Sequence, residues 1–575
     1  MEVFYLMRNH HVTYRVIKDK ETYLKKMNAS RHSTQNGVSY LKTLLRNKNN
    51  TLHVIIPAMN EADTISGVLD EVNRLDPDKV IVVVNGSTDQ TARIARNKGA
   101  SVIYYSEPLG NDLGRAIGAM DSDADIYLFT DADIVIKAED LLPFVHDIEN
   151  GTDVSINSVD NVTKVKGADM ISFARYYLNF IQQKPELRAE NILTIPHAFS
   201  KKGLDIIHKA TLTNPMLANA VAADKGLNIS VPHSIDVLSI NKIRPNHLLK
   251  EGEVMSGAMQ RMHGDMVEAL DYLTSTHGAS LHYPPLTNYQ AISDRLRLNW
   301  QAVSKVKSTT IVLAIPEQSN VLNDLCILCK SLDAEIIPVL SKTNSRAMSI
   351  LQGYNLPYIL LHEEKALYTY FDIGGQLAQG DVIFFHSADI LLNEAQINTF
   401  IHDVAHNNYD ISLNNQLAEV KEIENMNIIH IGNRLLTASI RSHNYDLDIS
   451  SLLVPPFALK RTVLAKLSPI TMQHLGRAYV KSLEQGLKVS KATFIDSSTF
   501  LRTYESQILS HQLDGIYYLL KKYGPRACFT DGYRLRKIIH NDVNVIKNTD
   551  QLYFNDINES FSMLSELPLE VLIVS

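Results

Sequence analysis

Cysteine is scarce in this chain of 575 residues, and its scarcity excludes a fold held by disulfide bonds. The three cysteines are Cys326, Cys329 and Cys528, too few for a disulfide framework and suited to a reducing compartment. Cys326 and Cys329 form a C-x-x-C pair, but no second pair or histidine cluster accompanies them. We therefore interpret them as two core-facing cysteines on one helix face, in preference to a redox or zinc site.

Long apolar runs and a strong excess of one charge are also missing. No run of about 18 apolar residues occurs, so no transmembrane segment is predicted, and the start lacks the apolar centre and cleavage site of a secretory signal. The 56 basic and 63 acidic residues give a formal net charge of −7, which argues against a general nucleic-acid binder. We expect a cytoplasmic protein. A location peripheral to a membrane or assembly complex is the alternative. Residues 1–50 are locally basic; we favour a solvated appendage packed on the first domain over a contact with anionic lipid or another polyanion.

The length requires more than one domain, since single cores stop growing at roughly 250–300 residues. From Leu52 to Ile136, strand-like runs alternate with helix-like stretches, which predicts βαβ units and a buried parallel sheet. The predicted strands are 53–56, 80–84, 101–105 and 125–129, and the predicted helices are 63–75, 89–98 and 112–120.

Three polar motifs follow predicted strands of this unit. They are Pro57-Ala58-Met59-Asn60-Glu61, Asn85-Gly86-Ser87-Thr88-Asp89 and Thr130-Asp131-Ala132-Asp133. Ligands of open parallel sheets bind beyond the carboxyl ends of the strands, so the motifs are expected at one edge. Two carboxylates one residue apart, Asp131 and Asp133, offer oxygen ligands to a hard divalent cation. The pattern predicts a nucleoside-diphosphate pocket.

The same pattern recurs in the second half of the chain. Residues 311–316 match the first predicted strand, and residues 381–390 match 125–134, so that Asp389 follows Asp133 by 256 positions. This interval is that of a whole domain and not of a solenoid module. The copies differ at the motifs, with Ser387 for Asp131, Ser345 for Asp89, and Ser319-Asn320 for Asn60-Glu61. A lone carboxylate holds a divalent ion poorly. We therefore hypothesise that the second domain is catalytically silent and serves scaffolding, acceptor binding or dimerisation.

The order and spacing of the three motifs carry a resemblance to a known family. Residues 52–136 resemble the nucleotide-sugar half of family 2-type glycosyltransferases of the GT-A fold. Extended to Leu273, the chain is similar to the glucosyl-3-phosphoglycerate and mannosylglycerate synthase type through Pro196-His197-Ala198-Phe199 and Arg244-Pro245-Asn246-His247. The resemblance implies an α/β protein with two tandem GT-A-like, Rossmann-like domains, each with a mostly parallel sheet, and a helical carboxy-terminal region. We delimit a basic extension at 1–50, the candidate catalytic domain at 51–278, a linker at 279–307, a degenerate GT-A-like domain at 308–496, and the helical region at 497–575.

The resemblance also implies roles for single residues. Pro57, Asn60 and Glu61 are expected to line the base and ribose together with Asn85 and Ser87, and Asp89 to lie near the edge of the base. Asp131 and Asp133 are the expected catalytic residues, Asp131 at the ribose and Asp133 on the Mn²⁺ or Mg²⁺ that bridges the diphosphate. His247 is favoured over His233 as a further metal ligand. Arg115 is expected to contact the diphosphate or ribose, and an exposed ion pair fits its position equally.

Two departures from the family pattern concern the chemistry. Asn111 stands where relatives commonly carry a lysine, so charge neutralisation at the diphosphate must come from elsewhere. Residues 212–216 hold no carboxylate where inverting relatives carry their general base. Three explanations stay open: a retaining enzyme, a base from another loop such as Asp224 or Asp236, or a domain that binds a nucleotide sugar without turnover.

The expected function is metal-dependent transfer of a hexose from a UDP- or GDP-sugar to a small-molecule or glycan acceptor, in surface or coat polysaccharide synthesis. The alternative is a non-catalytic sugar-nucleotide-binding or scaffold protein of a polysaccharide assembly complex. A nucleotidyltransferase is disfavoured because residues 58–62 contain neither glycine nor a basic residue. Residues 504–523 have helical spacing, and the region 497–575 is expected to pack on the second domain or to mediate a homodimer.

Overall fold

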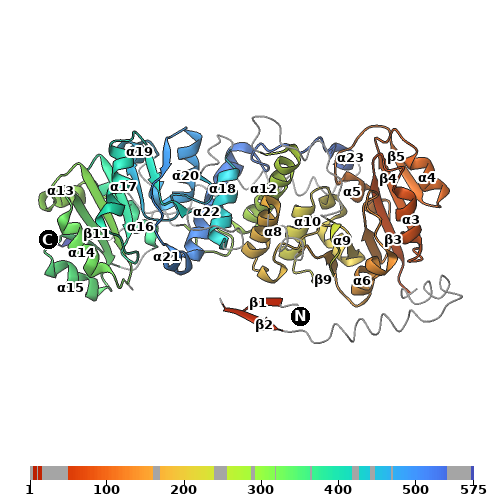
Figure 1. Ribbon diagram of the computed structural model, residues 1–575, viewed down its shortest axis with the longest axis horizontal. Coiled ribbons are helices and arrows are strands. Elements are labelled where there is room, and N and C mark those ends of the chain that lie inside the picture. Colours follow the sequence, from red (N-terminus) through yellow and green to blue (C-terminus); the bar gives the residue numbers. More distant parts are fainter. Residues whose placement is uncertain are drawn as a thin grey trace.

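The computed structural model describes residues 4–8, 11–15, 49–159, 169–237, 255–286, 292–317, 319–362, 366–416, 426–440, 447–467, 471–540 and 571–574. Two large sheets lie at opposite ends of an elongated molecule, and helices fill the space between them (Figure 1). A separate antiparallel pair is formed by β1 (Phe4–Arg8) and β2 (His11–Arg15).

The first sheet has seven strands. In spatial order they are β5 (Ser101–Tyr105), β4 (Lys79–Asn85), β3 (Leu52–Ala58), β6 (Ile126–Phe129), β8 (His197–Ser200), β7 (Val154–Asn157) and β9 (Ile229–His233). All neighbours pair in parallel except β8, which is antiparallel to both β6 and β7. The first four strands match the predicted ones to within two residues, because near-continuous Val and Ile runs indicate strands covered on both faces.

Helices cover both faces of this sheet. They are α3 (Ile65–Asn73), α4 (Thr91–Asn97), α5 (Leu113–Met120), α6 (Ala138–Glu149), α8 (Met170–Ile181), α9 (Lys201–Ile207), α10 (Pro215–Asp224) and α12 (Gly257–His277), with 3-10 turns at Pro185–Leu187 and Lys209–Thr213. Alternate strand residues divide between two apolar clusters. Val54 and Val82 pack with α3 and α6, whereas Ile55 and Val83 pack with α5. This division follows from the two-residue period of a strand.

The second sheet repeats the strand order of the first. It has eight strands, β16 (Val489–Lys491), β14 (Ile411–Leu413), β15 (Phe457–Lys460), β13 (Val382–Ser387), β10 (Thr309–Ile315), β11 (Glu335–Ser341), β12 (Tyr358–Leu361) and β17 (Val571–Val574). Read from the β12 end, the strands come in the order β12-β11-β10-β13-β15-β14-β16, which corresponds strand for strand to β5-β4-β3-β6-β8-β7-β9 of the first sheet. Like β8, β15 is antiparallel to both of its neighbours. The predicted fold class, two mostly parallel sheets with a helical carboxy-terminal region, is confirmed.

The helices of the second half include a set that packs against the first half. The helices are α13 (Asp294–Val303), α14 (Leu322–Ser331), α15 (Ser345–Gly353), α16 (Leu367–Leu377), α17 (Glu394–Ala405), α18 (Ile428–Ala438), α19 (Arg461–Leu467), α20 (Leu475–Glu484), α21 (Ser498–Thr503), α22 (Glu505–Tyr523) and α23 (Lys537–His540), with a 3-10 turn at Thr471–His474. One apolar cluster runs through α8, α12, α18 and α22. Within it the hydroxyl of Tyr177 donates to Gln512 Oε1 at 3.3 Å, so the two halves share a continuous core.

Two elements add to the predicted structure, and a third confirms the interpretation of the cysteines. The stretch 279–307, expected to be a linker, contains α13, whose fully buried Trp300 donates from Nε1 to Glu335 Oε1 of β11 at 3.0 Å. Residues 571–574 form β17, antiparallel to β12 at the sheet edge. Cys326 and Cys329 are both buried on α14, as the core interpretation predicted.

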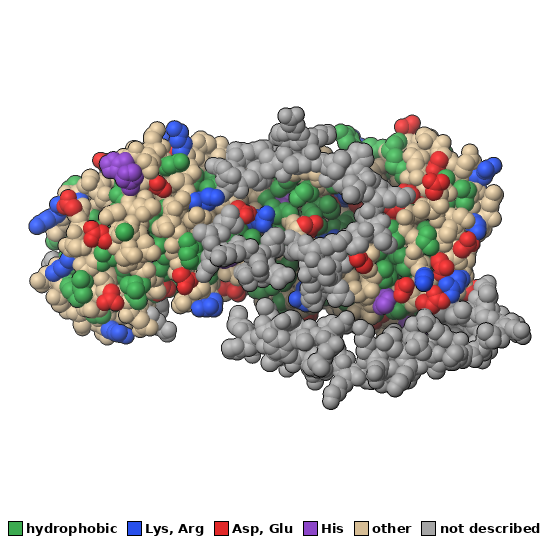
Figure 2. All heavy atoms as spheres, in the orientation of Figure 1, with side chains coloured by type: hydrophobic (Ala, Val, Ile, Leu, Met, Phe, Trp, Pro, Cys, Tyr) green, Lys and Arg blue, Asp and Glu red, His purple; other side chains and the backbone are tan. Residues whose placement is uncertain are grey.

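The mixed surface charge and the absence of a long apolar helix among the described residues agree with the near-balanced charge and the lack of long apolar runs in the sequence. Acidic and basic side chains are interspersed on the face shown in Figure 2, over both halves. Among the described residues, no helix combines the length and apolar character needed to cross a bilayer.

Candidate functional site

The first two motifs meet where β3 and β4 end. Asn60 lies in the left-handed region at φ 57°, and its side-chain Oδ1 accepts from the backbone N–H of Thr88 at 2.8 Å. In return the backbone N–H of Asn60 donates to Ser87 Oγ at 2.9 Å. The N–H of Glu61 donates to Thr91 Oγ1 at 2.8 Å. The loops after the two strands are therefore fixed to each other, as expected of parallel neighbours.

The carboxylate of Asp89 strengthens the same junction. It accepts from the N–H of Ala62 at 3.0 Å and from the N–H and hydroxyl of Thr91 at 3.0 and 2.5 Å. Burial is the largest single effect and raises the pKa of Asp89, but the hydrogen bonds from Thr91 and Ala62 together outweigh it and lower that pKa. Asn85 has a comparable bracing contact, because its Oδ1 accepts from the N–H of Leu109 at 3.0 Å.

The third motif joins the other two. The hydroxyl of Thr64 donates to the carbonyl of Ala132 at 2.8 Å, between Asp131 and Asp133, and to Glu61 Oε2 at 3.1 Å. Arg115 of α5 donates from Nη2 to Asp131 Oδ1 at 2.6 Å. The Asp131 side chain is 29% exposed. Burial raises its pKa, Arg115 opposes this, and the charge of Asp133 adds to it.

The side chains at this edge could hold a divalent cation only if a bound diphosphate supplied further oxygen ligands. Among the residues that the structure describes, no group of three or more His, Cys, Asp and Glu side chains is placed to hold a metal. Mg²⁺-type sites, however, use one or two carboxylates plus substrate phosphates. Asp131 and Asp133 repel each other electrostatically, and a bound cation would reduce this repulsion. The pair therefore fits an ion that arrives with a diphosphate, and His247, the expected further ligand, lies outside the described residues.

Several polar atoms at this edge are buried and lack a protein hydrogen-bond partner. They include Arg115 Nε, Thr130 Oγ1 and His197 Nε2. His197 pairs with Phe129 across β6 and β8 and stacks on its ring with centroids 5.1 Å apart. Burial lowers the pKa of His197 to about 3, so it is neutral. Because buried polar groups are normally satisfied, such atoms mark a place where a ligand or water completes the structure.

The other histidine and carboxylate candidates lie in separate contacts. His233 Nε2 is 3.2 Å from Asp140 Oδ1 of α6. Asp224 accepts from the hydroxyl of Tyr272 at 2.7 Å and also contacts His277, so it fixes α10 to α12. Both residues thus have structural partners.

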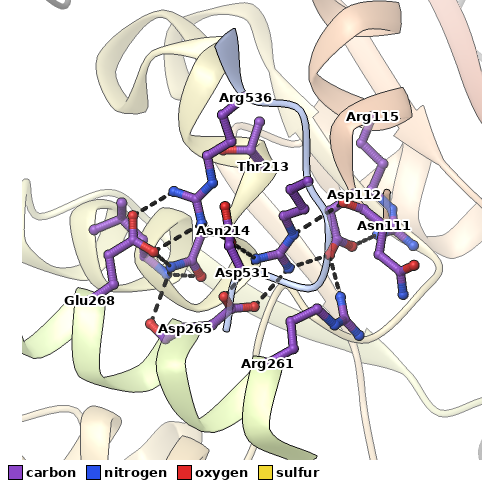
Figure 3. Close-up of polar contacts among 12 residues, drawn as sticks. Asn111, Asp112, Arg115, Thr213, Asn214, Arg261, Asp265, Glu268, Asp531 and Arg536 are labelled. Carbon is purple, nitrogen blue, oxygen red and sulfur yellow. Dashed lines mark hydrogen bonds and ion pairs between the residues drawn. The ribbon is translucent and has the colours of Figure 1, made fainter. Parts of the chain in front are cut away.

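A cluster of ion pairs beside α5 was missed by the sequence interpretation. The carboxylate of Asp112 contacts Arg115, and it accepts from Arg261 Nη1 at 2.9 Å and Arg534 Nη2 at 2.6 Å. Asp265 and Glu268 of α12 lie close by, and Nδ2 of Asn214 donates to Glu268 Oε2 at 3.0 Å (Figure 3). Asn214 belongs to the stretch that lacks the family's carboxylate, so α12 brings acidic groups to a place where the local sequence has none.

The corresponding edge of the second sheet keeps one loop contact of the first but differs in its charged residues. The hydroxyl of Ser319 donates to the carbonyl of Ala388, as Thr64 does to Ala132. Burial raises the pKa of Asp389, and α16, the counterpart of α5, carries no lysine or arginine. A cavity of about 320 Å³ opens beside Pro316 and is lined in part by Tyr370, Tyr504 and Gln507.

Comparison with known proteins identifies the family. Residues 53–200 match the model described as glycosyl transferase family 2. Protein RfbJ of Shigella flexneri is 38% identical over 108 residues, which are 18% of this chain and 81% of that protein. The chain belongs to glycosyl transferase family 2. The resemblance carried by the three motifs is thereby confirmed.

Other relatives match a shorter part of their own length. Dolichyl-phosphate hexose transferase of Haloferax volcanii is 33% identical over 132 residues, 22% of this chain and 57% of the enzyme. Glucosyl-3-phosphoglycerate synthase of Mycolicibacterium paratuberculosis is 35% identical over 97 residues, 15% of this chain and 29% of the enzyme. The chain thus spans 57% and 29% of the length of these two family 2 relatives.

Solved structures show a weaker likeness. Glucosyl-3-phosphoglycerate synthase from Mycobacterium tuberculosis in complex with UDP matches with a TM-score of 0.31 and 19% identity, over 41% of this chain and 86% of that chain. The same enzyme with Mn²⁺, UDP and glucosyl-3-phosphoglycerate matches with a TM-score of 0.30 and 18% identity, over 45% and 90%.

Proposed function

We propose that this chain is a metal-dependent glycosyltransferase that moves a hexose from a UDP- or GDP-sugar to a small-molecule or glycan acceptor. The observation that carries the proposal is the meeting of three polar loops at one sheet edge, where Arg115 contacts Asp131 and the charge of Asp133 acts on Asp131. Membership of glycosyl transferase family 2 supports it, as do relatives named for hexose transfer.

The proposed roles follow from the contacts. Asp133 and Asp131 would hold Mn²⁺ or Mg²⁺ together with the diphosphate, and the ion would offset the charge that develops on the leaving group. The loop from Pro57 to Glu61 would lie against the base and ribose. Its shape depends on Asn60, Ser87 and Asp89, whose polar groups are used in loop-to-loop hydrogen bonds. These three residues are therefore proposed to act by holding the pocket in shape.

We propose that the second half does not catalyse transfer. Its single motif carboxylate, Asp389, has Ser387 in place of a second aspartate, and its counterpart of α5 has no basic side chain. Scaffolding, acceptor binding and dimerisation are the proposed roles; the shared core supports the first and the cavity beside Pro316 the second.

A matched pair of variants tests both statements. Isothermal titration with UDP and Mn²⁺, followed by Mn²⁺-dependent hydrolysis of UDP- and GDP-hexoses, is expected to show binding and turnover in the wild type. Asp133→Ala is expected to abolish hydrolysis, while Asp389→Ala keeps it. Equal loss in both variants would contradict the silent second half, and absence of binding to any sugar nucleotide by the wild type would contradict the glycosyltransferase itself.

One observation favours a second function, that of a non-catalytic binding or scaffold protein in a polysaccharide assembly complex. Glu268 is the described carboxylate that contacts Asn214, in the stretch where inverting relatives carry their base. Burial opposes ionisation of Glu268, but Arg536 and Arg526 lower its pKa to about 2, which leaves it a weak base. UDP binding without turnover of any sugar nucleotide, in the presence of a broad acceptor mixture, would select this function.

A further inference from the structure

The chain returns from the second half to the first after α22. Residues 524–540, here called the carboxy-terminal strap, pass α12 and end in α23 beside α5 (Figure 1). The N–H of Leu535 donates to the carbonyl of Leu109 at 2.9 Å. Ile539 is buried in the same apolar cluster as Leu109 and Leu113. The strap is therefore attached to the loop that precedes α5.

Three arginines attach the strap to α12. Arg526 donates to Asp265 Oδ1 and Glu268 Oε2, each at 2.7 Å. Arg536 donates to Glu268 Oε1 at 2.6 Å and to Asp531 at 2.7 Å. Arg534 donates to Asp265 at 2.6 and 2.8 Å. Figure 3 shows Asp265, Glu268 and Arg536 on one side of this cluster and Asp112 and Arg115 on the other.

Arg534 alone of the three also contacts the loop before α5. Its side chain is 0% exposed, and it donates to Asp112 Oδ2 at 2.6 Å and from Nε to the carbonyl of Asn111 at 3.1 Å. Gly110 and Asp112 both have left-handed φ angles, 89° and 69°. A Cβ at Gly110 would lie 2.8 Å from Arg534 Cα. The loop thus has an unusual backbone shape with the strap pressed against it.

Two residues, Asp112 and Arg115, link Arg534 to the Asp131 carboxylate through three contacts. Asp112 links Arg534 to Arg115, and Arg115 donates to Asp131 at 2.6 Å. Burial raises the pKa of Asp112, but Arg534, Arg115 and Arg261 outweigh it and hold that pKa well below the usual range. The strap contributes three cations and one carboxylate, Asp531, to this cluster. These charges are paired with Asp112, Asp265 and Glu268, so the strap ties the loop before α5 to α12.

We propose that Arg534 is a positioning residue for the donor site, so that the affinity of the first half for its nucleotide depends on the strap formed by residues 524–540. The inference rests on the proposed function. Arg534 shapes the loop at Asn111 and Asp112, and that loop directs Arg115 at Asp131. Arg534 is itself 0% exposed and paired with Asp112 and Asp265, so it acts on the donor site through this loop and not by contact with the diphosphate.

Removal of Arg534 has a defined electrostatic consequence. Asp112 would retain Arg115 and Arg261, and Asp265 would retain Arg526, so two buried carboxylates would each lose a partner. Loss of one partner of a buried pair is strongly unfavourable. Arg115 would then be drawn toward Asp112 and away from Asp131. We expect Arg534→Gln to weaken UDP binding in the presence of Mn²⁺ by about tenfold, within the usual range of coupling between sites.

The experiment is isothermal titration of the full chain with UDP and Mn²⁺, with thermal unfolding measured in parallel. Arg536→Gln is the matched control, because Arg536 contacts Glu268 and Asp531 but no residue of the loop before α5 that the structure records. It is expected to lower the unfolding midpoint and leave UDP affinity within about twofold. Arg534→Lys keeps the charge without the planar fork, and an intermediate affinity is expected. Asp112→Asn combined with Arg534→Gln should give a non-additive loss.

Each outcome decides the matter. Wild-type binding with unchanged affinity in Arg534→Gln overturns the positioning role and leaves the proposed function standing. Equal weakening in Arg536→Gln, or additive losses in the double variant, reduces Arg534 to a general stabilising contact and also overturns it. Absence of UDP binding in the wild type refutes the proposed function and this inference with it. If Arg534→Gln does not fold, Arg534→Lys is judged by the same criterion.

Discussion

The left-handed backbone of Asn60 allows the cost of its conformation to be separated from the cost of its hydrogen bond. Asn60→Ala removes the 2.8 Å bond from the N–H of Thr88 to Oδ1 and leaves the Cβ at φ 57° without the polar group that compensates for it. Asn60→Gly removes the same bond but tolerates positive φ. The two variants therefore differ chiefly in backbone strain.

The expected magnitudes follow from those two terms. A lost hydrogen bond of this kind costs about 1 kcal/mol, and a left-handed alanine adds about 1 kcal/mol. Asn60→Ala is thus expected to cost about 2 kcal/mol and Asn60→Gly about 1 kcal/mol. For a unit of about 150–250 residues, each kcal/mol lowers the unfolding midpoint by roughly 2–4 °C. Both variants should also weaken UDP binding, because the loop at Thr88 loses its partner.

Thermal unfolding with and without UDP and Mn²⁺ is the assay, and Asn355 is the control. Asn355 has φ 50° and follows α15, and its side chain makes no recorded hydrogen bond to another described residue. Asn355→Ala should cost about 1 kcal/mol for strain alone, with no effect on UDP binding. Equal midpoints for Asn60→Ala and Asn60→Gly would refute the assignment of strain to Asn60, and unchanged UDP affinity in both would refute its role in shaping the pocket.

Two further predictions concern buried groups. Trp300→Phe removes the indole N–H that donates to Glu335 and is expected to destabilise the second half by about 1–3 kcal/mol. Urea unfolding followed by circular dichroism measures this loss of stability. An unchanged unfolding midpoint would contradict the contact between α13 and β11. Burial raises the pKa of Asp271 to about 6, so stability falls as pH rises from about 4, the unfolded pKa, to 6. Asp271→Asn should unfold at a higher temperature than wild type at pH 8 but not at pH 4; a pH-independent difference would speak against this.

Much of the fold could be predicted because it depends on local patterns. The runs at 53–56 and 80–84 are apolar at every position or nearly so, and a parallel sheet covered on both faces requires this. The strand order then brings the ends of β3, β4 and β6 together, so Asn60, Ser87 and Ala132 are linked through short hydrogen-bonded paths. Glycosyl transferase family 2 membership followed from the same three motifs.

The detailed use of side chains was harder to predict. Asp89 and Asn85 were expected to contact the nucleotide, and the structure shows their oxygens accepting from Ala62, Thr91 and Leu109. A polar residue after a strand signals the ligand edge, but the same residue type also braces loops, and only the geometry distinguishes these uses. Their contact with a nucleotide stays a prediction.

The sequence by itself determined the repeated strand and helix order, the edge at which the motifs meet, and the family, because each depends on residues close together in the chain. Only the tertiary structure decided what surrounds Asp112. Arg534 lies 422 positions away, and no periodicity or motif spacing encodes which distant arginine reaches a given carboxylate. That pairing arises because α8, α12, α18 and α22 share one core, which brings residues 524–540 back across the first half.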